Sequence, residues 1–212
     1  MASPSQEFTA KTLGWMRRWK SQGHLRPASG AYPHTDTEWA GLLEDISEKV
    51  RSGTFIFEHL YSTRIKGKVT VTTKSLEECL VLRKLNDNVR RSYGLKHQNR
   101  QSIVRTAKQA FYENTPKSVI RLDIKKCFES IDRQKVLAQL SSDGRLAFQS
   151  IALLDKFFEA CSKLTPQVTR HGLPRGIVIS TTLAEIQLQM IDRLIRRLPG
   201  VYLVLRYVDD IL

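Results

Sequence analysis

The spacing of apolar residues changes along this chain, and each spacing predicts a different element. Residues 36–53 carry apolar side chains at intervals of three and four and end at Gly53, which predicts an amphipathic helix. Between residues 55 and 71 the apolar positions fit extended segments, and Lys66-Gly67-Lys68 has the composition of a turn, so we expect a hairpin. Helical spacing predicts further helices from residue 76 to 93, over 101–113, after residue 132 and over 151–161.

Two strand-like runs end in acidic residues. Residues 118–124 carry Asp123 near their end, and the apolar run 201–206 leads into Tyr-Val-Asp-Asp, which contains Asp209 and Asp210. Neighbouring carboxylates are tolerated when a cation lies between them. If the two strands are adjacent, the three acids converge and offer oxygen ligands for two Mg²⁺ ions, or Mn²⁺, about 3.5–4 Å apart. The pattern predicts a metal site suited to nucleotide polymerisation.

A third segment joins a rigid turn to a helix. Gly172-Leu173-Pro174-Arg175-Gly176 predicts the turn, and residues 177–180 lead into the helix. Thr182 and Glu185 have the spacing of a capping box, and Pro199-Gly200 is expected to end the element.

The charge of the chain is concentrated in its middle. The net charge is +13, and residues 64–121 hold fourteen basic and four acidic side chains. Such a field is expected to bind phosphate backbones, although a solvated helical face is the competing interpretation. We expect cytoplasmic residence and no membrane partner, because the sequence has neither a bilayer-spanning apolar run nor a signal-peptide core. The three cysteines fit neither a disulfide framework nor a zinc site, and we expect reduced, partly buried thiols.

Taken in order, these segments resemble the reverse transcriptase family from about Gly53 to the last residue. Residues 123–131 are similar to family motif A, 172–186 to motif B and 207–210 to motif C. The resemblance implies an α+β fold of right-hand polymerase type, in which the antiparallel sheet of the palm packs on helices. It also implies an RNA template, a DNA product, dNTP substrates and two Mg²⁺ ions.

The resemblance carries residue roles onto matching positions. Asp123, Asp209 and Asp210 would be catalytic metal ligands, and Phe128 would exclude a ribose 2′-hydroxyl. The remaining implied contacts fall into two groups. Ile124, Arg64, Lys66 and Lys68 would bind the nucleotide, and Pro174, Arg175, Gly176 and Tyr207 would contact template or primer. Core packing is the alternative for Phe128, and an ordinary exposed surface position is the alternative for the two lysines.

The form Leu-Pro-Arg-Gly-x-x-x-Ser-x-x-Leu-Ala-Glu, which begins at Leu173, is most similar to bacterial abortive-infection and other defence-associated reverse transcriptases. Many intron-type and retroviral members have Gln where Arg175 stands. This subgroup implies an antiphage role, with synthesis from a 3′-hydroxyl or a protein primer. An associated non-coding RNA would dock on the basic middle segment.

The resemblance also divides the chain. Residues 1–52 would form an N-terminal extension with an amphipathic helix, 53–117 basic fingers, and 118–212 a palm that is incomplete at its C-terminus. Because two residues follow Asp210, we expect the return strand of the motif C hairpin and a thumb to be absent from this chain. A fragment, or completion by a partner, would then explain the sequence, and the chain alone would polymerise poorly.

Three other functions compete with a defence polymerase. A catalytically silent nucleic-acid-binding module would keep the fold, but three acids beside a polyanion would then be repulsive. An intron- or retron-type reverse transcriptase would have no defence role. An RNA-dependent RNA polymerase would share the palm, but Phe128 disfavours ribonucleotides.

Overall fold

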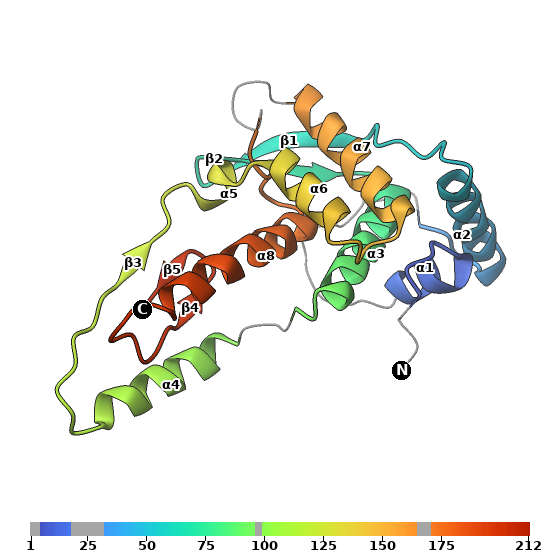
Figure 1. The fold of residues 1–212 in the computed structure, drawn as a ribbon. Helices are drawn as coiled ribbons and strands as arrows, with labels where there is room; N and C mark the ends of the chain where they lie inside the picture. Colours follow the sequence, from blue (N-terminus) through green and yellow to red (C-terminus); the bar gives the residue numbers. More distant parts are fainter. Residues whose placement is uncertain (1–4, 18–31, 96–98, 165–170) are drawn as a thin grey trace.

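The computed structural model describes residues 5–17, 32–95, 99–164 and 171–212, and Figure 1 shows their arrangement. Helices and short antiparallel sheets are mixed along the chain, which confirms the α+β class. The helices are α1 (Ala10–Arg17), α2 (Asp36–Arg51), α3 (Leu76–Ser92), α4 (Arg100–Tyr112), α5 (Cys127–Ser130), α6 (Arg133–Ser142), α7 (Phe148–Leu164) and α8 (Val178–Ile195). The strands are β1 (Leu60–Ile65), β2 (Lys68–Thr73), β3 (Leu122–Asp123), β4 (Arg206–Tyr207) and β5 (Asp210–Ile211).

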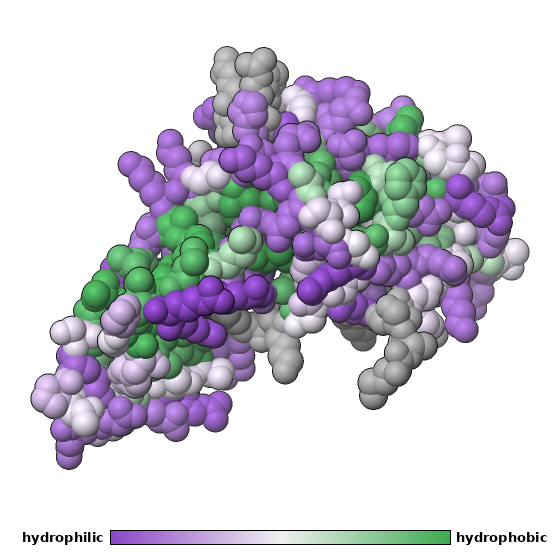
Figure 2. All heavy atoms as spheres, in the orientation of Figure 1, coloured by the Kyte–Doolittle hydropathy of each residue, from purple (hydrophilic) through white to green (hydrophobic). Residues whose placement is uncertain are grey.

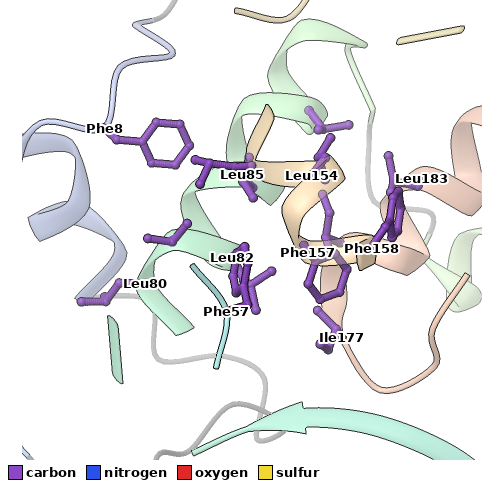
Figure 3. Packing of buried hydrophobic residues seen from close by; sticks show 14 of the residues in the cluster. Phe8, Phe57, Leu80, Leu82, Leu85, Leu154, Phe157, Phe158, Ile177 and Leu183 are labelled. Carbon is purple, nitrogen blue, oxygen red and sulfur yellow. The ribbon is translucent and has the colours of Figure 1, made fainter. Parts of the chain in front are cut away.

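Helix α3 forms the centre of the main core. Most of its side chains are buried, and it packs against α1, α7 and α8. Figure 3 shows Leu82 and Leu85 of this helix on the side where Leu154 and Phe157 of α7 lie, with Leu183 of α8 beside Phe158. Burial of these apolar side chains is the main force that holds the helices together.

The helix predicted over 36–53 is confirmed as α2. Thr35 accepts a hydrogen bond from the Glu38 amide, and the Glu38 carboxylate accepts one from the Thr35 amide, so a capping box begins the helix. Its buried residues include Trp39 and Ile46, which face α1 and the core.

The predicted hairpin is confirmed as β1 and β2, which pair antiparallel from Leu60 opposite Thr73 to Ile65 opposite Lys68. Lys66 and Gly67 form its two-residue turn with φ values of 50° and 76°. Positive φ at both central positions gives the turn a twist that matches the flanking strands. At the other end of the hairpin, the buried Glu78 carboxylate of α3 accepts hydrogen bonds from the amides of Glu58 and His59, both 2.7 Å long.

The second sheet has the order β3-β5-β4 and corrects two expectations. The strand with Asp123 lies beside β5, which begins at the second of the paired acids, Asp210, and not beside the strand that precedes them. A return strand is also present, because Asp210 and Ile211 pair with β3 on one side and β4 on the other. The Leu205 and Leu212 amides each donate to the other residue's carbonyl, at 2.9 and 2.8 Å, and extend this ladder.

The expected capping box at the start of α8 is wrong. The helix begins at Val178, so Thr182 and Glu185 lie inside it. The Thr182 hydroxyl donates to Asn86 Oδ1 of α3 at 2.5 Å, in a buried contact between the two helices. Tertiary packing therefore uses the side chains that local spacing assigned to a cap.

The apolar side chains of α8 are buried in its first half, and several near its C-terminal end are exposed. Leu183 and Ile186 belong to the core, whereas Met190 and Leu194 are exposed. In the view of Figure 2, apolar side chains gather around the small sheet and the nearby part of α8. Within the described ranges, none of the helices has the length and apolar character needed to cross a membrane.

Candidate active site

The small sheet brings the three predicted acids to one place in the backbone. Asp123 of β3 lies directly opposite Asp210 of β5, and the Ile124 amide donates to the Asp209 carbonyl at 3.1 Å. Residues opposite each other on antiparallel strands project from the same face of the sheet. Two segments separated by more than eighty residues therefore present Asp123 and Asp210 together, with Asp209 next to them in the turn.

The turn that carries Asp209 has an unusual backbone. Tyr207 pairs with Asp210, and Val208 and Asp209 form the link between β4 and β5. Val208 has a φ of 58°, a left-handed conformation that β-branched residues rarely adopt. Such conformations persist where surrounding contacts impose them, and they are frequent at functional sites.

Arg206, which the sequence analysis gave no role, supplies these contacts. Its side chain is buried and donates to Asp192 and Glu185 of α8 and to the Val208 carbonyl. Burial lowers the pKa of the Arg206 guanidinium, but the hydrogen bonds to Glu185 and Asp192 raise it by a larger amount. The pKa therefore lies above its ordinary value. One sequence signal could have indicated this residue: a basic side chain within an apolar run needs a buried acidic partner.

Asp210 also forms an ion pair. Arg121, one residue before β3, donates to its carboxylate with an Nη2–Oδ1 distance of 2.9 Å, and both side chains are well exposed. This hydrogen bond raises the pKa of the Arg121 guanidinium. The Arg121 guanidinium therefore neutralises one of the carboxylates that were predicted to bind a metal ion.

The donor set is chemically suited to a divalent metal, because hard cations prefer carboxylate oxygens. Within residues 5–17, 32–95, 99–164 and 171–212, however, no three His, Cys, Asp or Glu side chains stand close enough together to hold a metal ion. The backbone segments that carry Asp123, Asp209 and Asp210 therefore converge, but their side chains are not close enough together to form a metal site. Their role as metal ligands stays a prediction.

The turn predicted at 172–176 contacts two segments that carry other candidate residues: α5, which contains Phe128, and the β1–β2 hairpin. The Leu173 amide donates to the Phe128 carbonyl at 2.8 Å, and the Val71 amide of β2 donates to the Arg175 carbonyl at 2.7 Å. A Cβ on Gly172 would lie 2.7 Å from the Glu129 Cα, and one on Gly176 would lie 2.6 Å from the Val71 carbonyl oxygen. The absence of a side chain at Gly176 thus permits a close approach to β2.

Arg175 and Phe128 lie in contact. The Arg175 guanidinium stands 5.0 Å from the centre of the Phe128 ring and donates twice to the Glu129 carboxylate, at 2.7 and 2.9 Å. This pairing lowers the pKa of the Glu129 carboxyl and raises that of Arg175, to which the charge of Asp209 also contributes. The ring of Phe128 is half-buried and packs against the main core.

The remaining candidates occupy different environments. Arg64, Lys66 and Lys68 are exposed at the tip of the hairpin, and the charge of Lys68 contributes to the lowered pKa of Glu129. Tyr207 is exposed beneath Arg100 of α4, whose guanidinium lies 5.9 Å from the ring centre. Two other candidates are less accessible: Ile124 is half-buried and Pro174 is buried.

In Figure 1, α4 lies beside the small sheet and apart from the main core. Every α4 side chain is at least partly exposed, and the helix carries Arg100, Arg105 and Lys108. Part of the basic excess predicted from the sequence therefore lies next to the paired acids.

No curated protein matches the chain in a sequence comparison. A family model described as "Reverse transcriptase (RNA-dependent DNA polymerase)" matches residues 58–212, which is well over half of the chain and includes β3, β4, β5 and the 172–176 turn. The chain therefore belongs to the reverse transcriptase family.

Proposed function

We propose that the chain is the catalytic part of an RNA-directed DNA polymerase, in which Asp123, Asp209 and Asp210 would hold two divalent ions and the nucleotidyl group of a dNTP is transferred to a 3′-hydroxyl or a protein hydroxyl, with pyrophosphate as the leaving group. The observation that carries this proposal is the β3–β5 pairing, which sets Asp123 opposite Asp210 at the turn that contains Asp209. Bound Mg²⁺ or Mn²⁺ would neutralise phosphate charge and lower the pKa of the attacking hydroxyl. Arg121 would leave Asp210 when the ions enter.

We assign residues 53–117 to the fingers and 118–212 to the palm. The hairpin supports this division because β2 contacts the 172–176 turn through Val71, so the exposed lysines at its tip extend from a segment fixed beside the candidate site. Lys66, Lys68 and Arg64 would attract the triphosphate, and the basic residues of α4 would attract the nucleic acid backbone.

Phe128 would exclude ribonucleotides by its bulk. Its ring is held between the core and Arg175, so it cannot move away from a 2′-hydroxyl without disturbing both. We expect Phe128→Ala to increase the use of ribonucleotides relative to dNTPs by about tenfold, because a steric contact worth 1–3 kcal/mol is removed. Single-nucleotide incorporation with each substrate measures this ratio, and an unchanged ratio would leave Phe128 as a packing residue.

Arg175 would support the site through Glu129. Nε and Nη2 of its guanidinium donate to that carboxylate, so this edge of Arg175 would contact template phosphate only if the Glu129 pair opened. Pro174 and Gly176 would shape the loop, and Tyr207 and Ile124 would flank the acids.

A role in bacterial antiphage defence, in the cytoplasm and with an associated non-coding RNA, is proposed from the sequence form around Leu173–Glu185. Arg175 stands where other members commonly have Gln, and its ion pair with Glu129 offers a structural explanation for an arginine at this position. The silent nucleic-acid-binding module remains the second candidate, and the exposed basic residues of α4 favour it as far as binding alone is concerned.

The test is incorporation of labelled dNTPs with Mg²⁺ or Mn²⁺, with and without template and primer. The negative control is Asp209→Asn/Asp210→Asn, and the matched control is Asp155→Asn, which changes an exposed acid on α7. Template-dependent extension that only the double variant loses supports a conventional reverse transcriptase. Acid-dependent product attached to protein without a template supports the defence type, and nucleic acid binding without incorporation supports the silent module.

A further inference from the structure

The guanidinium of Arg206 is a buried cation with two acidic partners. Its side chain is 1% exposed. Removing a guanidinium from water is costly, and replacing a buried ion pair with apolar residues is often neutral or stabilising. A buried pair of this kind is better explained where it specifies one local geometry, and here that geometry belongs to the turn with the paired acids.

The guanidinium uses each of its five N–H donors. Nε donates to Asp192 Oδ1 at 2.8 Å, and Nη2 donates to Asp192 Oδ2 at 2.9 Å and to Glu185 Oε1 at 2.8 Å. Nη1 donates to Glu185 Oε2 at 2.9 Å and to the Val208 carbonyl oxygen at 3.1 Å. The planar fork is therefore held by four bonds to α8, while the fifth bond fixes the turn.

Helix α8 gives this contact a rigid reference. Glu185 and Asp192 are seven residues apart, about two helical turns, so they lie on the same side of α8. Other sides of the helix carry Leu183 and Ile186, which are buried in the main core. Arg206 thereby connects the turn to a helix of the main core.

The bond to Val208 acts directly on the position of Asp209. The Val208 carbonyl and the Asp209 amide belong to one planar peptide unit, so fixing the oxygen also fixes the direction in which the chain enters Asp209. Val208 has a left-handed φ of 58°, from which a valine would otherwise relax. The Asp209 carbonyl in turn accepts from the Ile124 amide, which connects the turn to the Asp123 strand.

The carboxylates of α8 also keep Arg206 away from the paired acids. Asp210 is paired with Arg121, while the donors of Arg206 are all directed to Glu185, Asp192 and the Val208 carbonyl. Arg206 therefore shapes the turn without neutralising the carboxylates that would receive cations.

We propose that Arg206 is a positioning residue: with Glu185 and Asp192 it holds the Val208–Asp209 peptide in the orientation that presents Asp209 and Asp210 to divalent ions. The inference rests on the proposed function for its metal-binding consequence. The orientation of the turn itself is independent of that function and can be measured separately.

Arg206→Lys is the decisive variant, because lysine keeps the charge but cannot reproduce the planar fork that reaches three partners. Arg133→Lys is the matched control. Arg133 is also buried and joins α6 to α7 through the Phe158 carbonyl, at 3.2 Å, and the Ser162 hydroxyl, at 2.7 Å. Glu185→Gln is a milder variant that retains Arg206 itself.

Two readouts are needed on the full chain: Mn²⁺ affinity by electron paramagnetic resonance, and hydrogen exchange of the Ile124 amide. Loss of a residue that orients metal ligands typically weakens metal binding by about 10–100-fold. We expect Arg206→Lys to weaken Mn²⁺ binding by about tenfold or more, with a smaller change for Glu185→Gln. We also expect exchange at Ile124 to accelerate in Arg206→Lys, with neither effect in Arg133→Lys.

If Arg206→Lys lowers the melting temperature but leaves both Mn²⁺ affinity and Ile124 exchange as in the unaltered chain, the residue is merely structural and the inference is wrong. If the unaltered chain binds no Mn²⁺ and incorporates no nucleotide, the proposed function fails. In that event, selective acceleration at Ile124 in Arg206→Lys would still support the positioning of the turn, and equal exchange would overturn it.

Discussion

At the scale of single residues, the contact between the 172–176 turn and β2 depends on Gly176. Its φ of 95° is strained for any L side chain, and an added Cβ would meet the Val71 carbonyl oxygen at 2.6 Å. We expect Gly176→Ala to lower the free energy of unfolding by about 2–4 kcal/mol, the combined cost of backbone strain and overpacking. Urea denaturation followed by circular dichroism measures this loss.

Gly53→Ala is the matched control for that substitution. Gly53 also has a positive φ, 74°, but an added Cβ would meet nothing within 4 Å. Its cost should stay near the backbone contribution of about 1–2 kcal/mol. Equal losses in the two variants would show that the contact with β2 contributes nothing.

The Glu129–Arg175 pair predicts a specific dependence of stability on acid. The pKa of Glu129 in the folded chain lies below its ordinary value of 4.5, chiefly because Arg175 donates to the carboxylate. A depressed folded pKa stabilises the protein above the unfolded pKa, and this stabilisation is lost as the pH falls through the folded pKa. We therefore expect Glu129→Gln to be less stable than the unaltered chain at pH 6, with the difference shrinking below pH about 4.5. A pH series of urea denaturations checks this, and a constant difference down to pH 3 would contradict it.

At the scale of elements, the spacing of apolar residues predicted those features that depend only on residues close together in the sequence. The bounds of α2, the hairpin turn at Lys66-Gly67 and the presence of α4 follow from local spacing and turn chemistry. The partner of each strand does not follow from local spacing, because strands such as β3 and β5 are far apart in the sequence. Hence β5 was expected to be absent, although Asp210 and Ile211 complete a ladder on both sides.

The same distinction applies to the candidate site. The three acids were recognised because carboxylates at strand ends call for a cation, whereas Arg206 went unnoticed because its partners lie on a helix 14 and 21 residues earlier. Glu185 was assigned to a cap on spacing alone, and the same spacing also fits a helix interior. Only the packing of α8 against β4 decides between these two interpretations.

A substitution at Thr182 tests whether this residue connects α8 to α3 instead of capping α8. If it joins α8 to α3 through Asn86, Thr182→Val should cost about 1–3 kcal/mol, because a buried acceptor loses its donor. Thr181→Val is the control, since Thr181 is the exposed neighbour on the same helix and should cost less than about 0.5 kcal/mol. The two free energies of unfolding are compared by urea denaturation, and a similar loss in both variants would refute the contact.

At the scale of the whole molecule, the structure contains a large core and a smaller region around the three-stranded sheet. The core joins α1, α2, α3, α6, α7 and α8 through buried apolar side chains. The region of β3, β4 and β5 is built from two-residue strands and exposes Leu122, Leu198 and Tyr202. Local opening is expected where few apolar contacts must be broken, so the region with the paired acids should open before the core.

The three buried thiols report this difference. Burial raises the pKa of each, to about 12 for Cys161 of α7, so the reactive thiolate forms only when the surrounding structure opens. Cys127 lies in the four-residue α5, close to Asp209, whereas Cys161 is part of the main core. We therefore expect iodoacetamide to label Cys127 first and Cys161 last, as followed by mass spectrometry of peptides at neutral pH. Labelling in denaturant should remove the order, because intrinsic reactivities then dominate. Native labelling of Cys161 as fast as Cys127 would mean that the small sheet and the core unfold as one unit, and the paired acids would then be as rigid as α3 and α7.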